Sequence, residues 1–271
     1  MTSDPDRQER AWFGQQPWRC RVEWGRRGAA AATARSDVLV VVDTLTFSTA
    51  VATALHRGVT VFPCLPGDEE RLAEEVGAEA ALRRKDVPSK GRFSLSPGTF
   101  LSSEPGARVA LGSPNGAACC LSAQAAPCVV VGALVNAQAV ARFVSARLAA
   151  CGLSVTVLAC GEPWPTPVEG EDLRFAVEDW LGAGAVLSHL GLAKSPEAEA
   201  CEAAFRGVQG RLEDVLLNCG SGVELREKGY TADVLHAARL DLHPVVPLLT
   251  EGRFVNAAAR GRREGDGKEH P

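Results

Sequence analysis

Runs of four or five apolar residues recur along this chain, and most are followed by a stretch with helical spacing. The clearest run is Val38–Val42, in which four of the five residues are β-branched valines. Such a run predicts a strand that is buried on both faces of a parallel sheet. The alternation of strands and helices predicts an α/β fold with a mostly parallel sheet. Further strands are expected at 19–24, 60–63, 79–82, 108–111, 128–131, 154–159 and 245–249.

The segments between the strands predict the helices and loops. Residues 83–105 are rich in proline, serine and glycine, which predicts a long functional loop, and a second loop with three prolines is expected at 163–167. We expect one domain over 17–256, between a disordered N-terminal extension, 1–16, and a disordered tail, 257–271. Helices are expected at 48–57, 68–76, 115–124, 136–148, 171–190, 195–205 and 208–218, and two short ones begin at Ser221 and Tyr230.

Composition and charge exclude several classes of protein. The 271 residues are 46% hydrophobic and 23% charged, which is typical of a soluble globular protein. The net charge of −4 and the lack of a long basic block argue against nucleic acid as a partner. No apolar stretch approaches the ~20 residues that span a bilayer. The charged N-terminus has no secretion signal, and the nine cysteines form no C-x-x-C pair, so we expect the reducing cytoplasm. The five histidines lack zinc-site spacing, and a homodimer remains open.

Asp43 directly follows the most apolar strand and precedes a cluster of hydroxyl side chains and a helix. A carboxylate at the carboxyl end of a central strand lies where open α/β sheets bind their ligands. Asp43 could hold a divalent cation there, and the helix N-terminus with Ser48 and Thr49 could bind phosphoryl oxygens. The alternative is that Asp43 only caps the helix and that the hydroxyls satisfy the backbone of the turn. The segment alone leaves both readings open.

Polar residues also follow other predicted strands. Asn115 with Gly116, Asn136, and Glu162 each come shortly after one strand. Because the carboxyl ends of parallel strands lie along one edge of a sheet, we expect these residues to share a polar cleft. Each one taken singly could instead be a helix cap.

Glu178 and Asp179 lie side by side within an otherwise apolar predicted helix. Adjacent helical residues point about 100° apart, so at least one carboxylate is expected to face the apolar side. Burial of a carboxylate is costly unless it meets a metal, a cation or backbone N–H groups. The alternative is that both flank the apolar stripe and remain solvated.

Taken together, six segments resemble, in order, the 2-phosphosulfolactate phosphatase family of coenzyme M biosynthesis. The first is the strand–turn–helix Val-Val-Asp-Thr-Leu-Thr-Phe-Ser-Thr-Ala at 41–50. The resemblance covers roughly residues 18–255. The later segments are Ser-Pro-Asn-Gly at 113–116, Gly-Ala-Leu-Val-Asn-Ala at 132–137, Val-Glu-Asp-Trp-Leu-Gly-Ala-Gly at 177–184, Ser-Gly-Val-Glu-Leu at 221–225 and Gly-Tyr-Thr-Ala-Asp-Val at 229–234.

The resemblance implies a three-layer α/β/α fold and a Mg²⁺-dependent phosphatase. The family hydrolyses a small anionic phosphoester, (2R)-2-phospho-3-sulfolactate, to 3-sulfolactate and phosphate. It implies catalytic roles for Asp43, Glu178 and Asp179. Because Mg²⁺ usually takes only one or two protein carboxylates, we expect it to be bound by Asp43 with one of Glu162, Glu178 or Asp179. Attack by water and attack by Asp43 itself, through an aspartyl-phosphate, both stay open. The substrate-binding residues expected are Ser48, Thr49, Arg84, Asn115, Gly116 and Asn136.

The chain also departs from the family pattern. Thr46 stands where the family has an arginine, and Arg84 alone matches a Gly-Glu-Arg-Gly-Gly loop. Arg92-Phe93-Ser94 replaces a Gly-Phe-Asp segment. These changes keep two alternatives alive: a phosphatase for another small phosphoester, and a non-catalytic ligand-binding homologue.

Overall fold

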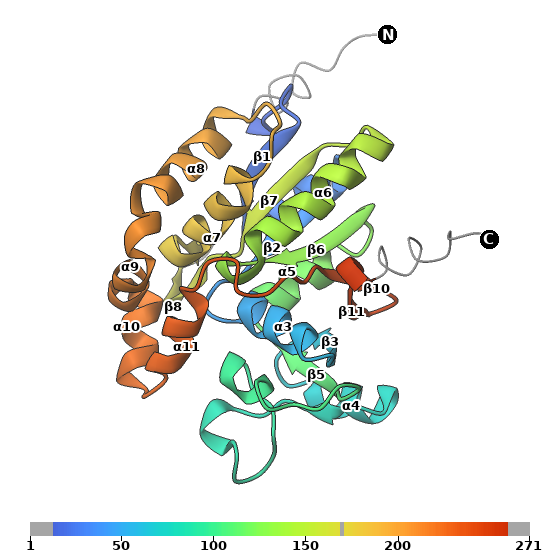
Figure 1. The fold of residues 1–271 in the computed structure, drawn as a ribbon, viewed down its shortest axis with the longest axis vertical. Coiled ribbons are helices and arrows are strands. Elements are labelled where there is room, and N and C mark those ends of the chain that lie inside the picture. The colour runs from blue at the N-terminus through green and yellow to red at the C-terminus, as the bar shows by residue number, and fades with distance from the viewer. Residues whose placement is uncertain (1–12, 169–170, 260–271) are drawn as a thin grey trace, which may run out of the picture.

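A nine-stranded sheet forms the centre of the computed structural model, which describes residues 13–168 and 171–259 (Figure 1). The predicted apolar runs form most of it, because β-branched residues pack well when both faces of a sheet are covered. The strand order is β1-β7-β2-β6-β10-β11-β3-β5-β4. The strands are β1 (Cys20–Trp24), β2 (Val38–Val42), β3 (Thr60–Cys64), β4 (Glu79–Ala80), β5 (Arg108–Gly112), β6 (Cys128–Gly132), β7 (Val155–Ala159), β10 (Pro247–Thr250) and β11 (Arg253–Asn256).

The sheet consists of two parallel groups joined by an antiparallel hairpin. Strands β1, β7, β2 and β6 are parallel to one another, and so are β3, β5 and β4. The hairpin β10–β11 pairs antiparallel with β6 on one side and with β3 on the other. The two groups therefore run in opposite directions, and Figure 1 shows them at opposite ends of the molecule.

Helices cover both faces of the sheet, which confirms the expected three layers. On β2, Val38, Val40 and Val42 face one apolar cluster, and Leu39 and Val41 face the other. The first cluster is covered by α6 (Ala137–Cys151), α7 (Val177–Ser188) and α8 (Pro196–Val208). The second is covered by α2 (Gly25–Ala34), α3 (Phe47–His56) and α5 (Gly116–Ser122).

The remaining elements lie around the strand ends and the edges of the sheet. Short helical turns cover Arg84–Asp86, Pro97–Phe100, Leu134–Asn136, Gln209–Arg211 and Ala257–Ala259. None of the helices in the described part of the chain is long and apolar enough to cross a membrane. The other elements are α4 (Glu69–Val76), α9 (Leu212–Asn218), α10 (Gly220–Glu227), α11 (Thr231–Ala237) and the hairpin β8 (Glu162–Val168) with β9 (Glu171–Arg174).

Several elements differ from the sequence prediction. Helix α2 was not expected, because its alanines leave no strong apolar stripe, although Ala29 and Ala32 are buried. The predicted loop at 163–167 belongs to strand β8 of a two-stranded sheet. Both strands of such a sheet are edge strands, and proline is tolerated there because one side of the backbone needs no N–H donor. Its partner β9 occupies the first residues of the predicted helix 171–190, which begins only at Val177.

The two predicted disordered ends lie mostly outside the described residues. Gln15, inside the predicted N-terminal extension, is buried, and its Oε1 accepts hydrogen bonds from the Val22 N–H (3.1 Å) and the Ser195 hydroxyl (2.7 Å). At the other end, Asn256 is the last residue of the predicted domain; it completes β11, and its Oδ1 accepts a hydrogen bond from the Val246 N–H (3.0 Å). A helical turn covers Ala257–Ala259, the first residues of the predicted tail.

Candidate active site

Asp43 lies at the carboxyl end of β2 and joins the two parallel groups of the sheet. Its carboxylate is 5% exposed. Oδ2 accepts hydrogen bonds from the Gly116 N–H (2.8 Å) and the Ser113 hydroxyl (3.3 Å), both of which follow β5. Oδ1 accepts from the Phe47 N–H at the start of α3 (3.3 Å). The residues that follow the strands therefore do come together, as expected. They come from the carboxyl ends of two strand groups that run in opposite directions, whereas a single parallel edge was expected.

Gly116 allows this close approach. A Cβ atom at this position would lie 2.3 Å from the Phe47 ring and 2.8 Å from Asp43 Oδ2. Any larger residue would therefore push the first turn of α5 away from the carboxylate. The requirement for glycine here is steric, and it preserves the contact between β2 and β5.

Glu178 and Asp179, in the first turn of α7, are both buried, at 2% and 3% exposure. Asp179 accepts hydrogen bonds from two backbone N–H groups, those of Thr44 (2.7 Å) and Gly161 (2.9 Å), and so ties together the ends of β2 and β7. Glu178 Oε1 has no hydrogen-bond partner. The alternative interpretation, in which both carboxylates remain solvated, is therefore wrong.

Three further carboxylates, those of Glu162, Glu178 and Asp179, lie near Asp43 and add negative charge to the site. Burial raises the pKa of Asp43, and the Glu178 charge raises it further, against the N–H bonds from Gly116 and Phe47. Burial, followed by the charges of Asp43 and Glu178, raises the pKa of Asp179 well above its usual range. Burial and the Asp43 charge raise the pKa of Glu162 to about 7, although Asn115 Nδ2 donates a hydrogen bond to its Oε2 (2.9 Å).

A cleft of about 270 Å³ opens over two of these acids, Asp43 and Glu162, whereas Glu178 and Asp179 do not line it. Asp43, Asn115 and Glu162 form its acidic wall. Opposite them, Arg84 Nε donates to Asp233 Oδ2 (3.1 Å), and the guanidinium lies 5.5 Å from the centre of the Tyr230 ring. The cleft is lined by Asp43, Leu45, Thr46, Phe47, Arg84, Leu95, Ser113, Pro114, Asn115, Glu162, Ser221, Glu224, Leu225, Lys228 and Tyr230.

Thr46 and Arg84 are linked in this cleft. Arg84 Nη2 donates a hydrogen bond to the Thr46 hydroxyl, and that hydroxyl lies 2.9 Å from the Leu95 carbonyl oxygen to which it donates. Thr46 occupies the position at which the sequence lacks the family arginine. Arg84, from the loop, thus contacts the residue at which the resemblance places that arginine.

Three predicted substrate-binding residues point elsewhere. The Ser48 hydroxyl accepts a hydrogen bond from the Asp43 N–H (2.8 Å), and the Thr49 hydroxyl donates to the Thr44 carbonyl (2.8 Å). Asn136 Oδ1 accepts from the Ala133 N–H (2.8 Å), and its amide donates to the Val131 carbonyl. All three are buried, and none lines the cleft, so the geometry gives their predicted contact with substrate no support. Ser48 and Thr49 hold the backbone around Asp43, as in the alternative proposed for the hydroxyls, and Asn136 holds the turn after β6.

The cleft also contains residues that sequence reasoning missed. The Ser221 hydroxyl, in the first turn of α10, is buried without a partner and faces the cleft. Lys228 and Tyr230 follow the same helix, and Asp233 begins α11. The resembling segments 221–225 and 229–234 were a signal for three of them, but nothing local to the sequence paired Asp233 with Arg84.

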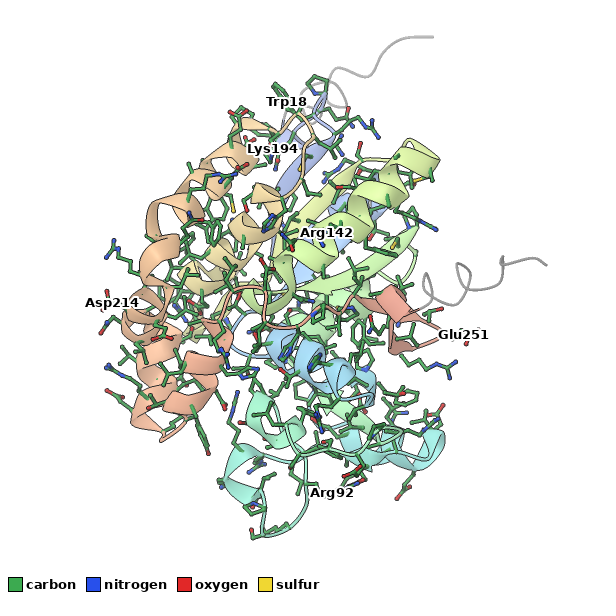
Figure 2. All side chains as sticks on the ribbon, viewed as in Figure 1. Trp18, Arg92, Arg142, Lys194, Asp214 and Glu251 are labelled. Atoms are coloured by element: carbon green, nitrogen blue, oxygen red, sulfur yellow. The ribbon has the colours of Figure 1, made fainter. Side chains whose placement is uncertain are left out.

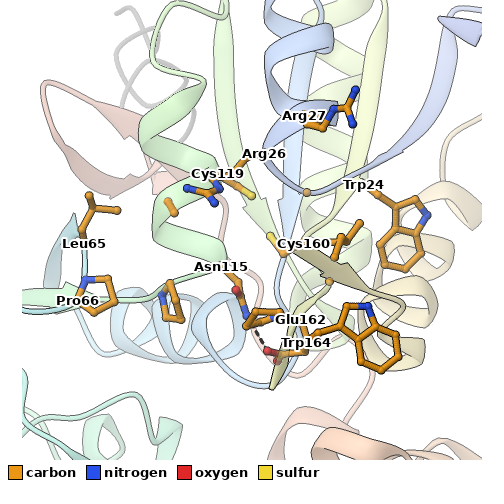
Figure 3. Close-up of a pocket in the computed structure, with 16 residues that line it drawn as sticks. Trp24, Arg26, Arg27, Leu65, Pro66, Asn115, Cys119, Cys160, Glu162 and Trp164 are labelled. Atoms are coloured by element: carbon orange, nitrogen blue, oxygen red, sulfur yellow. Dashed lines mark hydrogen bonds between the residues drawn. The ribbon is translucent and has the colours of Figure 1, made fainter. Parts of the chain in front are cut away.

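A second, larger cavity of about 660 Å³ adjoins the cleft (Figure 3). Pro114, Asn115 and Glu162 line both spaces. Figure 3 shows the Asn115–Glu162 hydrogen bond at this boundary, with Trp24 and Trp164 to one side and Leu65 and Pro66 to the other. The acidic wall is therefore shared by two compartments.

The residues present fit a hard divalent cation. The described residues offer no group of three His, Cys, Asp or Glu side chains arranged as a ready ligand set. Mg²⁺ needs less, because it binds through one or two carboxylates and keeps several waters. The orphaned Glu178 Oε1 and the mutual repulsion of Asp43 and Glu178 mark a place where positive charge would stabilise the fold.

A polar cleft at the carboxyl ends of the strands is the arrangement in which open α/β proteins bind their ligands. The family model described as 2-phosphosulpholactate phosphatase matches residues 28–252. The chain therefore belongs to the 2-phosphosulfolactate phosphatase family, a family of phosphoric monoester hydrolases.

Individual relatives agree with this placement. A protein of Gloeobacter violaceus named probable 2-phosphosulfolactate phosphatase is 30% identical over 226 residues, which cover 79% of this chain and 89% of the relative. Proteins of the same name from Carboxydothermus hydrogenoformans and Thermosynechococcus vestitus are 29% and 30% identical, each over 239 residues. These alignments cover 84% and 82% of this chain, and 93% of each relative.

Proposed function

We propose that this protein hydrolyses 2-phospho-3-sulfolactate, or a closely similar phosphorylated hydroxy acid, to the free hydroxy acid and phosphate, with Mg²⁺ as cofactor. The observation that carries the proposal is the set of acids at Asp43, Glu162, Glu178 and Asp179, of which Glu162 is half-buried and the others are buried; burial and mutual repulsion raise the pKa values of Asp43, Glu162 and Asp179. The names of the relatives support the same reaction.

In this proposal the cations opposite the acids bind the phosphoryl group. Arg84 is held by Asp233 and Tyr230, so its guanidinium is oriented before substrate arrives. Charge-assisted hydrogen bonds from arginine to phosphate are among the stronger ones in proteins. Lys228 and the unpartnered Ser221 hydroxyl face the same space and can donate to further phosphoryl oxygens.

Asp43 and Glu178 are the residues we assign to Mg²⁺. When bound, the ion would neutralise the phosphoryl oxygens that otherwise repel an incoming nucleophile. Asp179 has both carboxylate oxygens bonded to backbone N–H groups, so we assign it to positioning the ends of β2 and β7. Glu162 was also expected as a metal ligand; its place at the boundary of the two compartments favours a role in proton transfer.

The bond changes are those of a simple hydrolysis. A water oxygen forms the new bond to phosphorus, and the bond from phosphorus to the ester oxygen breaks. The ester oxygen takes a proton from Glu162, which regains one from the attacking water. We favour water over Asp43 as the nucleophile because no segment after Asp43 resembles the motifs of phosphatases that form an aspartyl-phosphate.

The experiment is a phosphate-release assay with 2-phospho-3-sulfolactate and Mg²⁺, beside phospholactate, phosphoglycolate and a sugar phosphate. We expect turnover of the phosphorylated hydroxy acids and little release from the sugar phosphate. Equal rates on all four compounds would contradict a dedicated acidic substrate. No release from any of them would favour the non-catalytic ligand-binding alternative.

A further inference from the structure

Three histidines meet where α3, α11 and the segment that leads to β10 come together. His56 ends α3, His236 lies on α11, and His243 lies between α11 and β10. Figure 1 shows this last segment passing beside α3. The His243 N–H donates to the Val135 carbonyl (2.7 Å), which fixes the segment against the turn after β6. The spacing of these histidines along the sequence did not predict that they would meet.

Two ring nitrogens and one hydroxyl oxygen lie close together in this cluster. His236 Nε2 is 3.4 Å from His243 Nε2, and Thr53 Oγ1 is 3.0 Å from the first and 3.3 Å from the second. Thr53 donates its own hydroxyl proton to the Thr49 carbonyl (2.8 Å). Its oxygen therefore has lone pairs available on the side of the two rings.

These distances match the coordination of a transition-metal ion. Zn²⁺ binds imidazole nitrogens at about 2.0–2.1 Å, so two such ligands of a tetrahedral ion are about 3.3–3.4 Å apart. The Nε2 atoms of His236 and His243 have this separation. A direct N–H···N hydrogen bond between them would be long. An ion between the two rings would use the lone pairs of both nitrogens.

The cluster combines a buried floor with a side that solvent can reach. His243 and Thr53 are buried, whereas His236 is half-buried. The ring of His56, which stacks on His243 with centroids 4.6 Å apart, is exposed. Among the described residues, no third His, Cys, Asp or Glu side chain completes a ligand set, so an ion here would keep at least one water.

The charges near His236 have opposite signs. The Arg239 guanidinium opposes a bound cation, and the Asp233 carboxylate favours one. Asp233 also holds Arg84 in the cleft, and it lies one turn before His236 on α11. An ion bound by His236 would therefore fasten the same helix that orients Arg84.

We propose that His236, His243 and Thr53 form a metal site, separate from the acidic cleft, for a divalent ion that prefers imidazole, such as Zn²⁺. The chain provides two nitrogens and a hydroxyl oxygen, and water completes the coordination. The role of the ion is structural, because it joins α11 to α3. The site does not depend on the proposed reaction, since none of its three ligands lines the cleft.

The binding test is calorimetric titration with Zn²⁺ of the full chain, freed of transition metals and kept in excess Mg²⁺. We expect one Zn²⁺ to bind per chain, and His236→Gln and His243→Gln each to weaken that binding at least about 10-fold. His189→Gln is the matched control, because this partly exposed histidine pairs with Asp241 outside the cluster, and its effect should stay below about twofold. A wild-type protein that binds no Zn²⁺, or cluster variants that bind it as tightly as wild type, would overturn the proposal.

Two further measurements locate the ion and guard against misfolding. In Zn²⁺ at a hundredfold excess over its Kd, the Tm of the wild type should rise by at least about 4 °C, and that of His236→Gln should rise far less. His236 is half-buried, so this variant carries the test even if His243→Gln does not fold. Asp43→Asn should still bind Zn²⁺. A loss of binding in Asp43→Asn would place the ion in the acidic cleft and overturn the proposal, as would equal Tm shifts in wild type and His236→Gln.

Discussion

Two buried aspartates bracket the central strand β2, and their surroundings are opposite. Asp37, just before β2, is 1% exposed and is met by two arginines: Arg21 Nη1 lies 2.8 Å from Oδ1, and Arg35 Nε lies 3.1 Å from Oδ2. The Thr156 hydroxyl also donates to Oδ2 (2.7 Å). Asp43, just after β2, is 5% exposed and is surrounded by three further carboxylates.

The comparison distinguishes Asp37, whose charge is balanced by arginines of the fold, from Asp43, whose charge would be balanced by a bound ligand. A buried carboxylate is tolerated when a cation and hydrogen bonds accompany it, as at Asp37. At Asp43 the hydrogen bonds come from neutral groups, and the Glu178 charge adds to burial in raising its pKa. The missing positive charge is therefore expected to arrive with a metal ion and to be complemented by Arg84.

Removal of divalent cations should have the largest effect on activity. Exhaustive chelation with EDTA should abolish phosphate release, with a loss of at least about 1,000-fold, and Mg²⁺ should restore it. Zn²⁺ should restore little, because the donors are hard carboxylate oxygens with no cysteine or histidine in the cleft lining. Undiminished activity after chelation would contradict a catalytic role for a metal ion.

Asp37→Asn should affect stability and leave the chemistry intact. The substitution leaves the buried Arg21 guanidinium without its carboxylate and Arg35 with Glu23 alone, which should lower the free energy of unfolding by about 3–5 kcal/mol. Urea denaturation measures this. Asp214→Asn is the control, because its pair with Arg211 is 3.9 Å long and largely exposed (Figure 2), so the change should stay below ~1 kcal/mol. Similar midpoints for the two variants would refute a structural role for Asp37.

Arg84→Ala should weaken substrate binding more than it slows turnover. The loss of a partly buried guanidinium that contacts phosphate should raise KM at least 10-fold, equivalent to about 1.4 kcal/mol. Some stability will also be lost, since Asp233 keeps only its bond from Ser96. Arg92→Ala controls for this loop, because Arg92 pairs with the exposed Glu79 at the surface (Figure 2). If the two variants differ in KM by less than threefold, Arg84 is not a substrate ligand.

A histidine cluster far from Asp43 in the sequence should make the fold sensitive to acid. Thr53 Oγ1 lies 3.0 Å from His236 Nε2 and 3.3 Å from His243 Nε2, and the His56 and His243 rings stack with centroids 4.6 Å apart. Burial and the charges of His56, His236 and Arg239 lower the pKa of His243 to about 4, and burial also lowers that of His236.

The sign of this effect follows from the lowered pKa. The unfolded chain takes up protons near pH 6.5 while folded His243 stays neutral, so its contribution is present above pH 6.5 and is lost between about pH 6.5 and 4. The loss should be roughly 1–3 kcal/mol. His243→Gln should flatten the stability profile between pH 7 and 5, as urea midpoints would show. An equally steep profile in the variant would exclude His243 as the cause.

The sequence predicted the strands better than the way in which they assemble. Valine-rich runs such as β2 are recognisable because burial on both faces demands them. The opposed direction of the two parallel groups was not predictable, because β10 and β11 pair with β6 and β3 through only one aligned residue pair each. Helix α2 escaped notice because alanine favours a helix without marking which face is buried.

At the site, residues that directly follow strands were predictable and distant partners were not. Asp43, Asn115 and Glu162 come together as their places after strands suggested. The pairing of Arg84 with Asp233 spans 149 residues, and no local pattern encodes it. Ser48 and Thr49 show the limit of such reasoning, since a hydroxyl after a strand can as readily support the backbone as bind a ligand.

The most direct test of the central claim is Asp43→Asn, measured by phosphate release and thermal unfolding on the same preparation. The substitution keeps the shape and one acceptor oxygen for the Gly116 N–H, and it removes a charge that burial disfavours. We predict that kcat/KM falls at least about 1,000-fold, while Tm stays within about 5 °C of wild type. Near-normal turnover with an unchanged Mg²⁺ requirement would contradict the account, and Asp43 would then be a second structural aspartate like Asp37.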